Sequence, residues 1–126
     1  MTTLKLRIYF DEAMLGPGKA ELLEGIRDTG SIAAAGRAMG MSYKRAWMLV
    51  EEMNAGWQAP LVSSARGGPG GGGAALTDAG TEVLRLYRDV MARAEAAVAE
   101  PVTRLEGMLK PGRPAVAVTS DMSKGR

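Results

Sequence analysis

The run of six glycines and one proline at positions 67–73 restricts what this chain of 126 residues can fold into more than any other feature. Glycine loses the most conformational entropy on ordering, and a segment almost without side chains has nothing to bury. Three uses are physically sensible for such a run. It serves as a phosphate-binding loop of an enzyme, as a flexible linker between domains, or as a loop whose bare backbone approaches a partner closely.

The residues on either side of the glycines favour the last of these uses. A phosphate-binding loop of the Walker type needs a lysine after its last glycine and leads from a strand directly into a helix. Here no lysine follows, and the apolar run Ala74-Ala75-Leu76 comes before any predicted helix. Leu61-Val62 lies on the other side, and the two apolar runs predict a hairpin with the glycines at its tip. A flexible linker remains the alternative.

The composition narrows the classes of function. The sequence contains neither cysteine nor histidine, which excludes thiolate and imidazole metal sites and also Ser-His or Cys-His catalysis. We therefore expect no enzyme, no metal site and no cofactor. No apolar run reaches the roughly 18 residues of a membrane-spanning helix, and the N-terminus has no apolar signal core. We expect a cytoplasmic protein without a membrane partner.

The first thirty residues predict one strand and one helix. Apolar residues alternate with lysine and arginine between positions 4 and 8, which is typical of a half-buried strand over residues 4–10. Gly16-Pro17-Gly18 interrupts this pattern. Leucine, isoleucine and alanine then recur at helical spacing until Thr29-Gly30, which predicts the end of a helix.

Two further helices follow in quick succession. Ser31 is a good N-cap for a helix over residues 32–39, whose alanines and glycine allow another helix to approach closely. Ser42 offers the next N-cap, after a turn at Gly40. The helix that it starts has an apolar stripe formed by Ala46, Leu49, Val50, Met53 and Trp57. Two short helices joined by a short turn that contains glycine form the helix-turn-helix pattern.

The last predicted helix is long for so small a core. Thr77 is its predicted N-cap. Glu100-Pro101 allows an interruption, and residues 102–109 allow the helix to continue for a further turn or two. Its apolar stripe consists of Val83, Tyr87, Val90, Met91, Ala94 and Val98. The stripe either covers the domain's own core or packs against a second chain. Helix-turn-helix proteins commonly bind two half-sites about 34 Å apart as dimers, so we predict a homodimer formed through this helix.

The net charge of the chain is only +2, which is too small to indicate a nucleic-acid partner by itself. The evidence for such a partner is the position of the cations in the sequence. Residues 31–50 contain Arg37, Lys44 and Arg45 and no acidic residue. Lys44 and Arg45 fall in the first turn of a helix, where the helix dipole disfavours positive charge but attracts phosphate. A DNA backbone explains this arrangement, and a solvated surface turn is the alternative. Trp47 either faces DNA or is half-buried beside the apolar stripe.

We expect two DNA-contacting surfaces. The first surface is the helix-turn-helix. Its second helix is predicted to contact DNA through Ser42, Tyr43, Lys44, Arg45, Trp47 and Met48, and its first helix through Ser31 and Arg37. Glycine lets backbone N–H groups come close to phosphate, so the glycine run forms the second surface. The hairpin with the glycines at its tip is called the wing here. Its predicted phosphate contacts are Arg66, Gly67, Gly68, Gly70, Gly71, Gly72 and Gly73.

The order strand, helix, helix, helix, hairpin, helix predicts a winged helix-turn-helix. This is an α+β fold, mainly α, with an N-terminal strand, a two-stranded wing and a long C-terminal dimerisation helix. We expect the DNA-binding domain to span residues 1–110. Residues 111–126 are rich in Pro, Ser, Thr and Gly, and we expect them to form a mobile tail.

Several short motifs resemble one known family. They are Gly30-Ser31-Ile32, Met41-Ser42-Tyr43-Lys44-Arg45-Ala46-Trp47, Met53-Asn54, Arg66-Gly67-Gly68, Gly70-Gly71-Gly72-Gly73-Ala74, Leu76-Thr77 and Gly80. Over about residues 16–92, the chain resembles the N-terminal DNA-binding domain of the ModE family of molybdate-responsive regulators, a relative of the LysR-type winged helix. The resemblance implies a dimer on a palindromic operator, with genes of molybdate transport as the usual targets.

The chain departs from that family in two respects. Pro69 stands where family members usually have a lysine, which puts one phosphate contact of the wing in doubt. Full-length members carry C-terminal β-barrel domains that bind molybdate, and a chain of 126 residues has no room for them. We therefore do not expect oxyanion sensing in this chain. A separate oxyanion-sensing protein as a partner is left open.

Together these patterns predict a homodimer that binds double-stranded DNA sequence-specifically and regulates transcription. A non-specific architectural DNA-binding protein and a protein-interaction adaptor with the same fold are the alternatives. The three differ in how their binding depends on DNA sequence and on salt.

Overall fold

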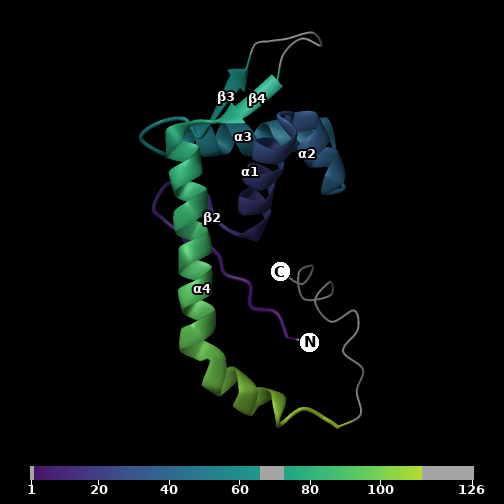
Figure 1. Cartoon of the computed structure of the whole chain (residues 1–126), viewed down its shortest axis with the longest axis vertical. Helices are drawn as coiled ribbons and strands as arrows, with labels where there is room; N and C mark the ends of the chain where they lie inside the picture. Colours follow the sequence, from purple (N-terminus) through teal and green to yellow (C-terminus); the bar gives the residue numbers. More distant parts are fainter. Residues whose placement is uncertain (1, 66–72, 112–126) are drawn as a thin grey trace.

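The computed structural model describes residues 2–65 and 73–111. Within these ranges the chain is mainly helical, with four helices and two small antiparallel hairpins, an α+β arrangement as predicted (Figure 1). The elements in chain order are β1 (Ile8–Tyr9), β2 (Met14–Leu15), α1 (Pro17–Thr29), α2 (Ile32–Ala38), α3 (Tyr43–Gly56), β3 (Val62–Ala65), β4 (Gly73–Leu76) and α4 (Asp78–Glu106). No helix in the described part of the chain is both long enough and apolar enough to cross a membrane.

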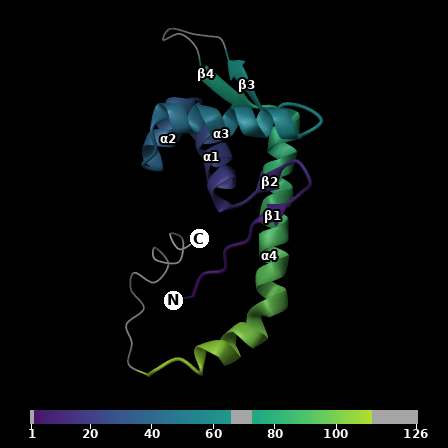
Figure 2. The same ribbon diagram turned by 180° about the vertical axis from the view of Figure 1, so that it is seen from behind.

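Helices α1, α2 and α3 gather at one end of α4, and the β3–β4 hairpin extends beyond them (Figure 1). The other half of α4 extends away from this group, as the reverse view also shows (Figure 2). The N-terminal segment is tied to α4 at two places. The Tyr87 hydroxyl donates to the Leu6 carbonyl at 2.7 Å, and the Thr2 hydroxyl donates to the carboxylate of Glu106.

The N-terminal strand is shorter than predicted and has a partner that the sequence pattern did not reveal. Only Ile8–Tyr9 of the predicted strand 4–10 is extended in a sheet, and it pairs antiparallel with Met14–Leu15. Residues 4–7 keep the predicted alternation of half-buried leucines and exposed cations. No strand of the described ranges pairs with them, so the alternation there reflects packing alone.

The predicted helix ends are confirmed at most positions. The hydroxyl oxygens of Ser31, Ser42 and Thr77 each accept the backbone N–H three residues later, at 2.9 to 3.1 Å. Gly30 ends α1 in the left-handed conformation, with φ of 72°. Gly16-Pro17-Gly18 ends the strand pattern as predicted, and Pro17 is also the first residue of α1. Proline suits that position because the first helical N–H needs no partner within the helix.

Small residues bring the first three helices close together, as predicted. A Cβ atom added to Gly36 would lie 2.8 Å from the Cβ of Ala46, so α2 and α3 are in direct contact there. A Cβ atom on Gly25 would lie 2.8 Å from that of Ala35, which brings α1 equally close to α2. Real Cβ atoms are not found this near to one another, so these glycines set the helix spacing.

The core lies between α1, α3, the base of the β3–β4 hairpin and the first half of α4. The buried apolar residues are Leu15, Ala20, Leu22, Leu23, Ile26, Ala35, Ala46, Val50, Met53, Leu61, Val62, Ala74, Leu84 and Tyr87. Helix α3 contributes three of the five residues of its predicted stripe, and the other two are half-buried against the same cluster. The stripe therefore fixes which face of α3 points away from the core.

Helix α4 does not stop at its proline. It runs continuously from Asp78 to Glu106 with Pro101 inside it, so of the two outcomes that the sequence allowed the helix shows continuation. The ribbon changes direction in its last turns (Figure 1). A proline inside a helix removes one hydrogen bond and commonly kinks the axis without ending it.

Candidate nucleic-acid interface

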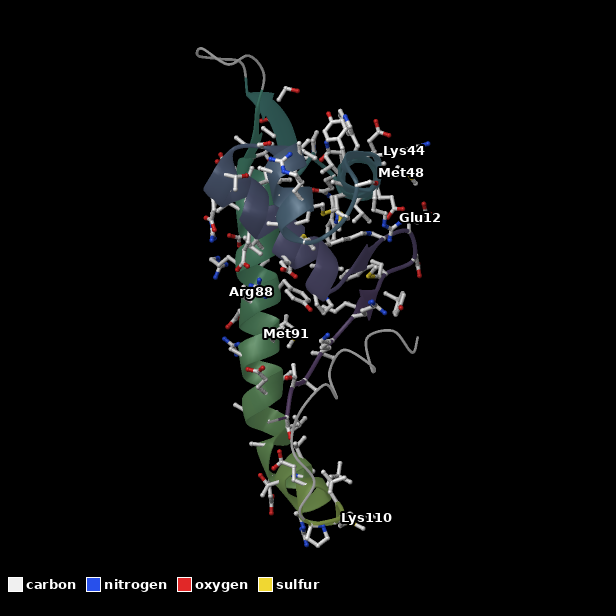
Figure 3. All side chains as sticks on the ribbon, turned by 90° about the vertical axis from the view of Figure 1, so that its right-hand side faces the viewer. Glu12, Lys44, Met48, Arg88, Met91 and Lys110 are labelled. Atoms are coloured by element: carbon white, nitrogen blue, oxygen red, sulfur yellow. The ribbon has the colours of Figure 1, made fainter. Side chains whose placement is uncertain are left out.

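The exposed face of α3 carries the side chains that the sequence predicted to contact DNA. With the apolar stripe turned inward, Tyr43, Trp47 and Met48 remain 55%, 39% and 47% exposed. Lys44 and Arg45 are exposed as well. Lys44 and Met48 lie on the side of α3 that faces away from α4 (Figure 3). Trp47 is thus partly exposed beside the apolar stripe, which agrees with both of its alternatives.

The turn between α2 and α3 holds these residues in place. The Met41 N–H donates to the carbonyl of Gly36 at 3.0 Å, which closes the turn before Ser42 caps α3. The hydroxyl oxygens of Ser31 and Ser42 are used as caps, but a hydroxyl also has one proton to donate. Both serines can therefore cap their helices and still donate to a phosphate. Arg37 is exposed on the last turn of α2.

The cations of this face differ in their partners from the cations of α1 and α4. All four arginines of α4 form ion pairs, as do Lys19 and Arg27 of α1. Arg37, Lys44 and Arg45 pair with no carboxylate of the residues that the structure describes. Their charges are therefore available to an anionic partner.

A hollow of about 410 Å³ separates this face of α3 from the β3–β4 hairpin. Its polar and aromatic lining includes Ser31, Tyr43, Trp47, Asn54, Ser63 and Ser64. The hairpin itself has the predicted pairing, with Val62 opposite Leu76 and Ala65 opposite Gly73. The predicted wing thus stands beside the predicted recognition helix, with a groove of mixed polar and apolar lining between them.

Most of the predicted wing contacts lie outside the described residues. They are Arg66, Gly67, Gly68, Gly70, Gly71 and Gly72, and Pro69 lies there too. Gly73 is described, as the first residue of β4, where it is half-buried. The phosphate-contacting role of the glycine run therefore stays a prediction.

Sequence reasoning missed two polar residues that fix the position of α3. Asn54 bonds to the backbone of Leu61 and Val62 at the base of the hairpin. Lys19 of α1 is only 7% exposed; its ammonium donates to the Met14 carbonyl at 3.1 Å and lies 3.2 Å from the carboxylate of Glu52 on α3. Lysine is rarely buried without a partner. The position of Lys19 on the apolar face of α1 could therefore have predicted that its ammonium group binds a carbonyl or a carboxylate.

Tyr87 is wrong as a predicted dimer contact. It is 2% exposed and belongs to the core of its own chain, where its hydroxyl bonds to Leu6. Burial raises the pKa of Tyr87 above its ordinary value. Met91, one turn further along α4, packs against the same core (Figure 3). The inner side of the predicted stripe is therefore already covered by its own chain.

The outer side of the stripe remains exposed. Val90 is 39% exposed, and Leu86, which is not part of the predicted stripe, is 46% exposed one helical turn before it. Three further predicted dimer contacts, Val83, Ala94 and Val98, are half-buried. The apolar arc of α4 is thus wider than the surface that the described part of the chain covers. We call Leu86 and Val90 the outer strip.

Comparisons with known proteins support the resemblance at the level of sequence. No family model matches the chain. The chain is 43% identical over 97 residues to the molybdenum-pterin-binding protein MopB of Rhodobacter capsulatus, 42% over 89 residues to the transcriptional regulator ModE of Yersinia pestis, and 40% over 93 residues to the DNA-binding transcriptional dual regulator ModE of Escherichia coli K12. These matches cover 77%, 69% and 74% of this chain but only 34%, 32% and 34% of the relatives. The chain thus spans about a third of the length of the curated relatives it matches.

Proposed function

We propose that this chain binds double-stranded DNA as the winged helix-turn-helix domain of a ModE-type regulator of transcription. The observation that carries the proposal is the contrast between the unpaired cations of α2 and α3 and the paired cations of α1 and α4. Arg37, Lys44 and Arg45 are exposed without a described carboxylate partner, whereas every arginine of α4 has one. DNA phosphates would supply the missing partners. The proposed activity is binding, and no catalytic step is part of it.

Helix α3 would act as the recognition helix. Its exposed face offers Tyr43, Lys44, Trp47 and Met48 to base edges in the major groove, which is wide enough to admit a helix. Phosphate contacts would come from Arg37, Arg45 and the two capping serines, close to the positive end of the α3 dipole. The β3–β4 hairpin would act as the wing, with Arg66 and the glycines on the phosphate backbone.

A homodimer would form through the outer strip of α4. The strip gives Leu86 and Val90 a partner that the described part of one chain does not supply. Two copies would present two α3 helices to successive major grooves, about 34 Å apart. The dimer contacts proposed here are therefore Leu86 and Val90, with the half-buried Val83, Ala94 and Val98 as secondary contacts. They no longer include Tyr87 and Met91, which pack in the core of their own chain.

The names of the relatives suggest the biological setting. The Escherichia coli relative is named a DNA-binding regulator and the Rhodobacter capsulatus relative a molybdenum-pterin-binding protein. We propose that the target genes of this chain belong to molybdenum metabolism. The matched third of these relatives would carry DNA binding, and the described residues would hold no molybdate site of their own.

Selection from a random DNA library, followed by binding curves at two salt concentrations, tests the proposal. A specific regulator selects a palindrome and binds it about 10³-fold or more tightly than random DNA. An architectural protein binds both alike with a steep salt dependence, and an adaptor binds neither. Binding without sequence preference, or no binding, would refute the proposed function. A genomic footprint of the purified protein near molybdate transport genes tests the setting.

A further inference from the structure

One side chain joins the two proposed DNA-contacting elements. The Asn54 Oδ1 atom accepts the backbone N–H of Leu61 at 2.9 Å and that of Val62 at 3.0 Å, and its Nδ2 atom donates to the Val62 carbonyl at 3.1 Å. This orientation of the amide gives each of its atoms a partner of the correct polarity. A half-buried amide on α3 thus satisfies three backbone groups at the base of the hairpin.

The same backbone is held from its other side by the start of α4. Thr77 donates its N–H to the Leu61 carbonyl at 3.0 Å and its hydroxyl to the Pro60 carbonyl at 2.6 Å. A Cβ atom on Gly80 would lie 2.1 Å from the Leu61 carbonyl oxygen, so only glycine permits this approach. Leu61 itself is completely buried. Helix α3, the hairpin and α4 therefore meet at Leu61.

Further from its base, the hairpin stands apart from α3. The hollow between them is lined by Trp47, Val50 and Asn54 on the α3 side and by Ser63 and Ser64 on β3. Residues of α3 and β3 thus line opposite sides of one hollow. The Asn54 bonds, at the floor of this hollow, fix the distance between the two elements.

We propose that Asn54 is a positioning residue for DNA binding, which holds the β3–β4 hairpin in register with α3 so that both contact the duplex at once. The inference rests on the proposed function. A hairpin fixed before binding loses less conformational freedom on the DNA than one that must be ordered there, so its contacts contribute more to affinity.

A double-mutant cycle tests this role. Ser64→Asp places a negative charge on an exposed position of β3, beside the proposed path of the phosphates. In the wild-type background it should weaken binding about fivefold or more. In the Asn54→Ala background the same change should weaken binding less than about twofold, because the hairpin is no longer held against the DNA. All variants are measured at a temperature where circular dichroism shows them folded.

The matched control is Ile26→Val, which loosens the core at a fully buried position of α1 that bonds to neither α3 nor the hairpin. A general loss of stability would affect both backgrounds, so the Ser64→Asp penalty should stay at its full size with Ile26→Val. Asn54→Asp keeps the oxygen acceptor for both N–H groups, but it loses the bond to the Val62 carbonyl and adds a negative charge there. Its own effect on DNA binding is therefore measured separately, and the Ser64→Asp penalty in this background should be intermediate. Asn54→Asp also serves as the test variant if Asn54→Ala does not fold.

Amide hydrogen exchange gives a second readout without DNA. The N–H groups of Leu61 and Val62 should exchange faster in Asn54→Ala than in the Ile26→Val control. Equal Ser64→Asp penalties in the wild-type and Asn54→Ala backgrounds would overturn the positioning role and leave the proposed function standing. A wild-type protein that binds no DNA would overturn the proposed function, and the positioning role with it.

Discussion

Replacing the outer strip with Leu86→Glu and Val90→Glu should convert a dimer into folded monomers. Fully burying a leucine or valine contributes about 1.5–3 kcal/mol, and here about half of each side chain is still exposed. The two residues in each of two chains would therefore contribute about 3–5 kcal/mol to association. Losing that contribution raises the dissociation constant of the dimer about 10²- to 10³-fold or more, before charge repulsion is counted.

The monomer should stay folded, because the side chains that the core needs lie on the other side of α4. Tyr87 and Leu84 are buried and are left unchanged. The matched control places the same two charges at Ala96 and Ala99, which are exposed on α4 away from the outer strip. Sedimentation equilibrium at micromolar concentration measures association, and far-UV circular dichroism measures folding.

DNA binding should follow association. The outer-strip variant should lose most of its affinity for a two-site palindrome and keep its weak affinity for a single half-site, while the control variant behaves as the wild type. Each half-site alone offers half the contacts, so the dimer gains by holding two of them together. A wild-type protein that sediments as a monomer and still binds one compact site would refute the reasoning, as would an outer-strip variant that remains a dimer.

Three further predictions concern single features of the chain. Lys44→Ala should cost about 1–3 kcal/mol of affinity for the selected operator if Lys44 reads a base, with far less loss on random DNA, and equal losses would restrict it to phosphate. Alanines at residues 70–73 should weaken binding to operator and random DNA alike in filter-binding assays, and unchanged binding would mean that the glycine run is only a linker. Arg66→Ala should lower the slope of log affinity against log salt concentration by about 0.9 per wing. Because the pKa of Tyr87 is raised in the folded protein, the unfolded chain loses the phenolic proton at a lower pH than the folded chain does. The free energy of unfolding should therefore fall as the pH rises above about 10, and urea titrations should show a weaker fall for Tyr87→Phe.

Much of the fold could be predicted because it depends on residues that are close together in the sequence. Ser31, Ser42 and Thr77 are good N-caps in any helical context, and each caps its helix. Gly36 allows α3 to approach because of its size alone. The apolar runs beside the glycines pair as predicted because a hairpin needs no distant partner. The strand Met14–Leu15 was missed since two residues are too few to show a period.

Contacts between distant segments account for what the sequence did not reveal. Periodicity gave the apolar arc of α4, but it does not record which part is covered by the N-terminal segment, so Tyr87 was assigned to a dimer although it bonds to Leu6. The role of Asn54 depends on backbone groups seven and eight residues away, across a loop without periodicity. Side-chain bonds to the backbone leave no repeating pattern in a sequence.

The short length of the outer strip also predicts how two α4 helices cross. Leu86 and Val90 are one helical turn apart, which suits helices that cross at an angle better than a parallel coiled coil with a long seam. Thr77, where α4 meets the hairpin base, lies about 20 Å along the helix from Val90. Helices that cross at Val90 would therefore spread their DNA-binding ends apart, whereas parallel helices about 8–10 Å apart would hold them close together. The chain has no cysteine, so single cysteines can be introduced cleanly. Val90→Cys should form a disulfide-linked dimer under mild oxidation, and Thr103→Cys, near the far end of α4, should not. Equal cross-linking at both positions would contradict the crossing and indicate a parallel pair along the whole of α4.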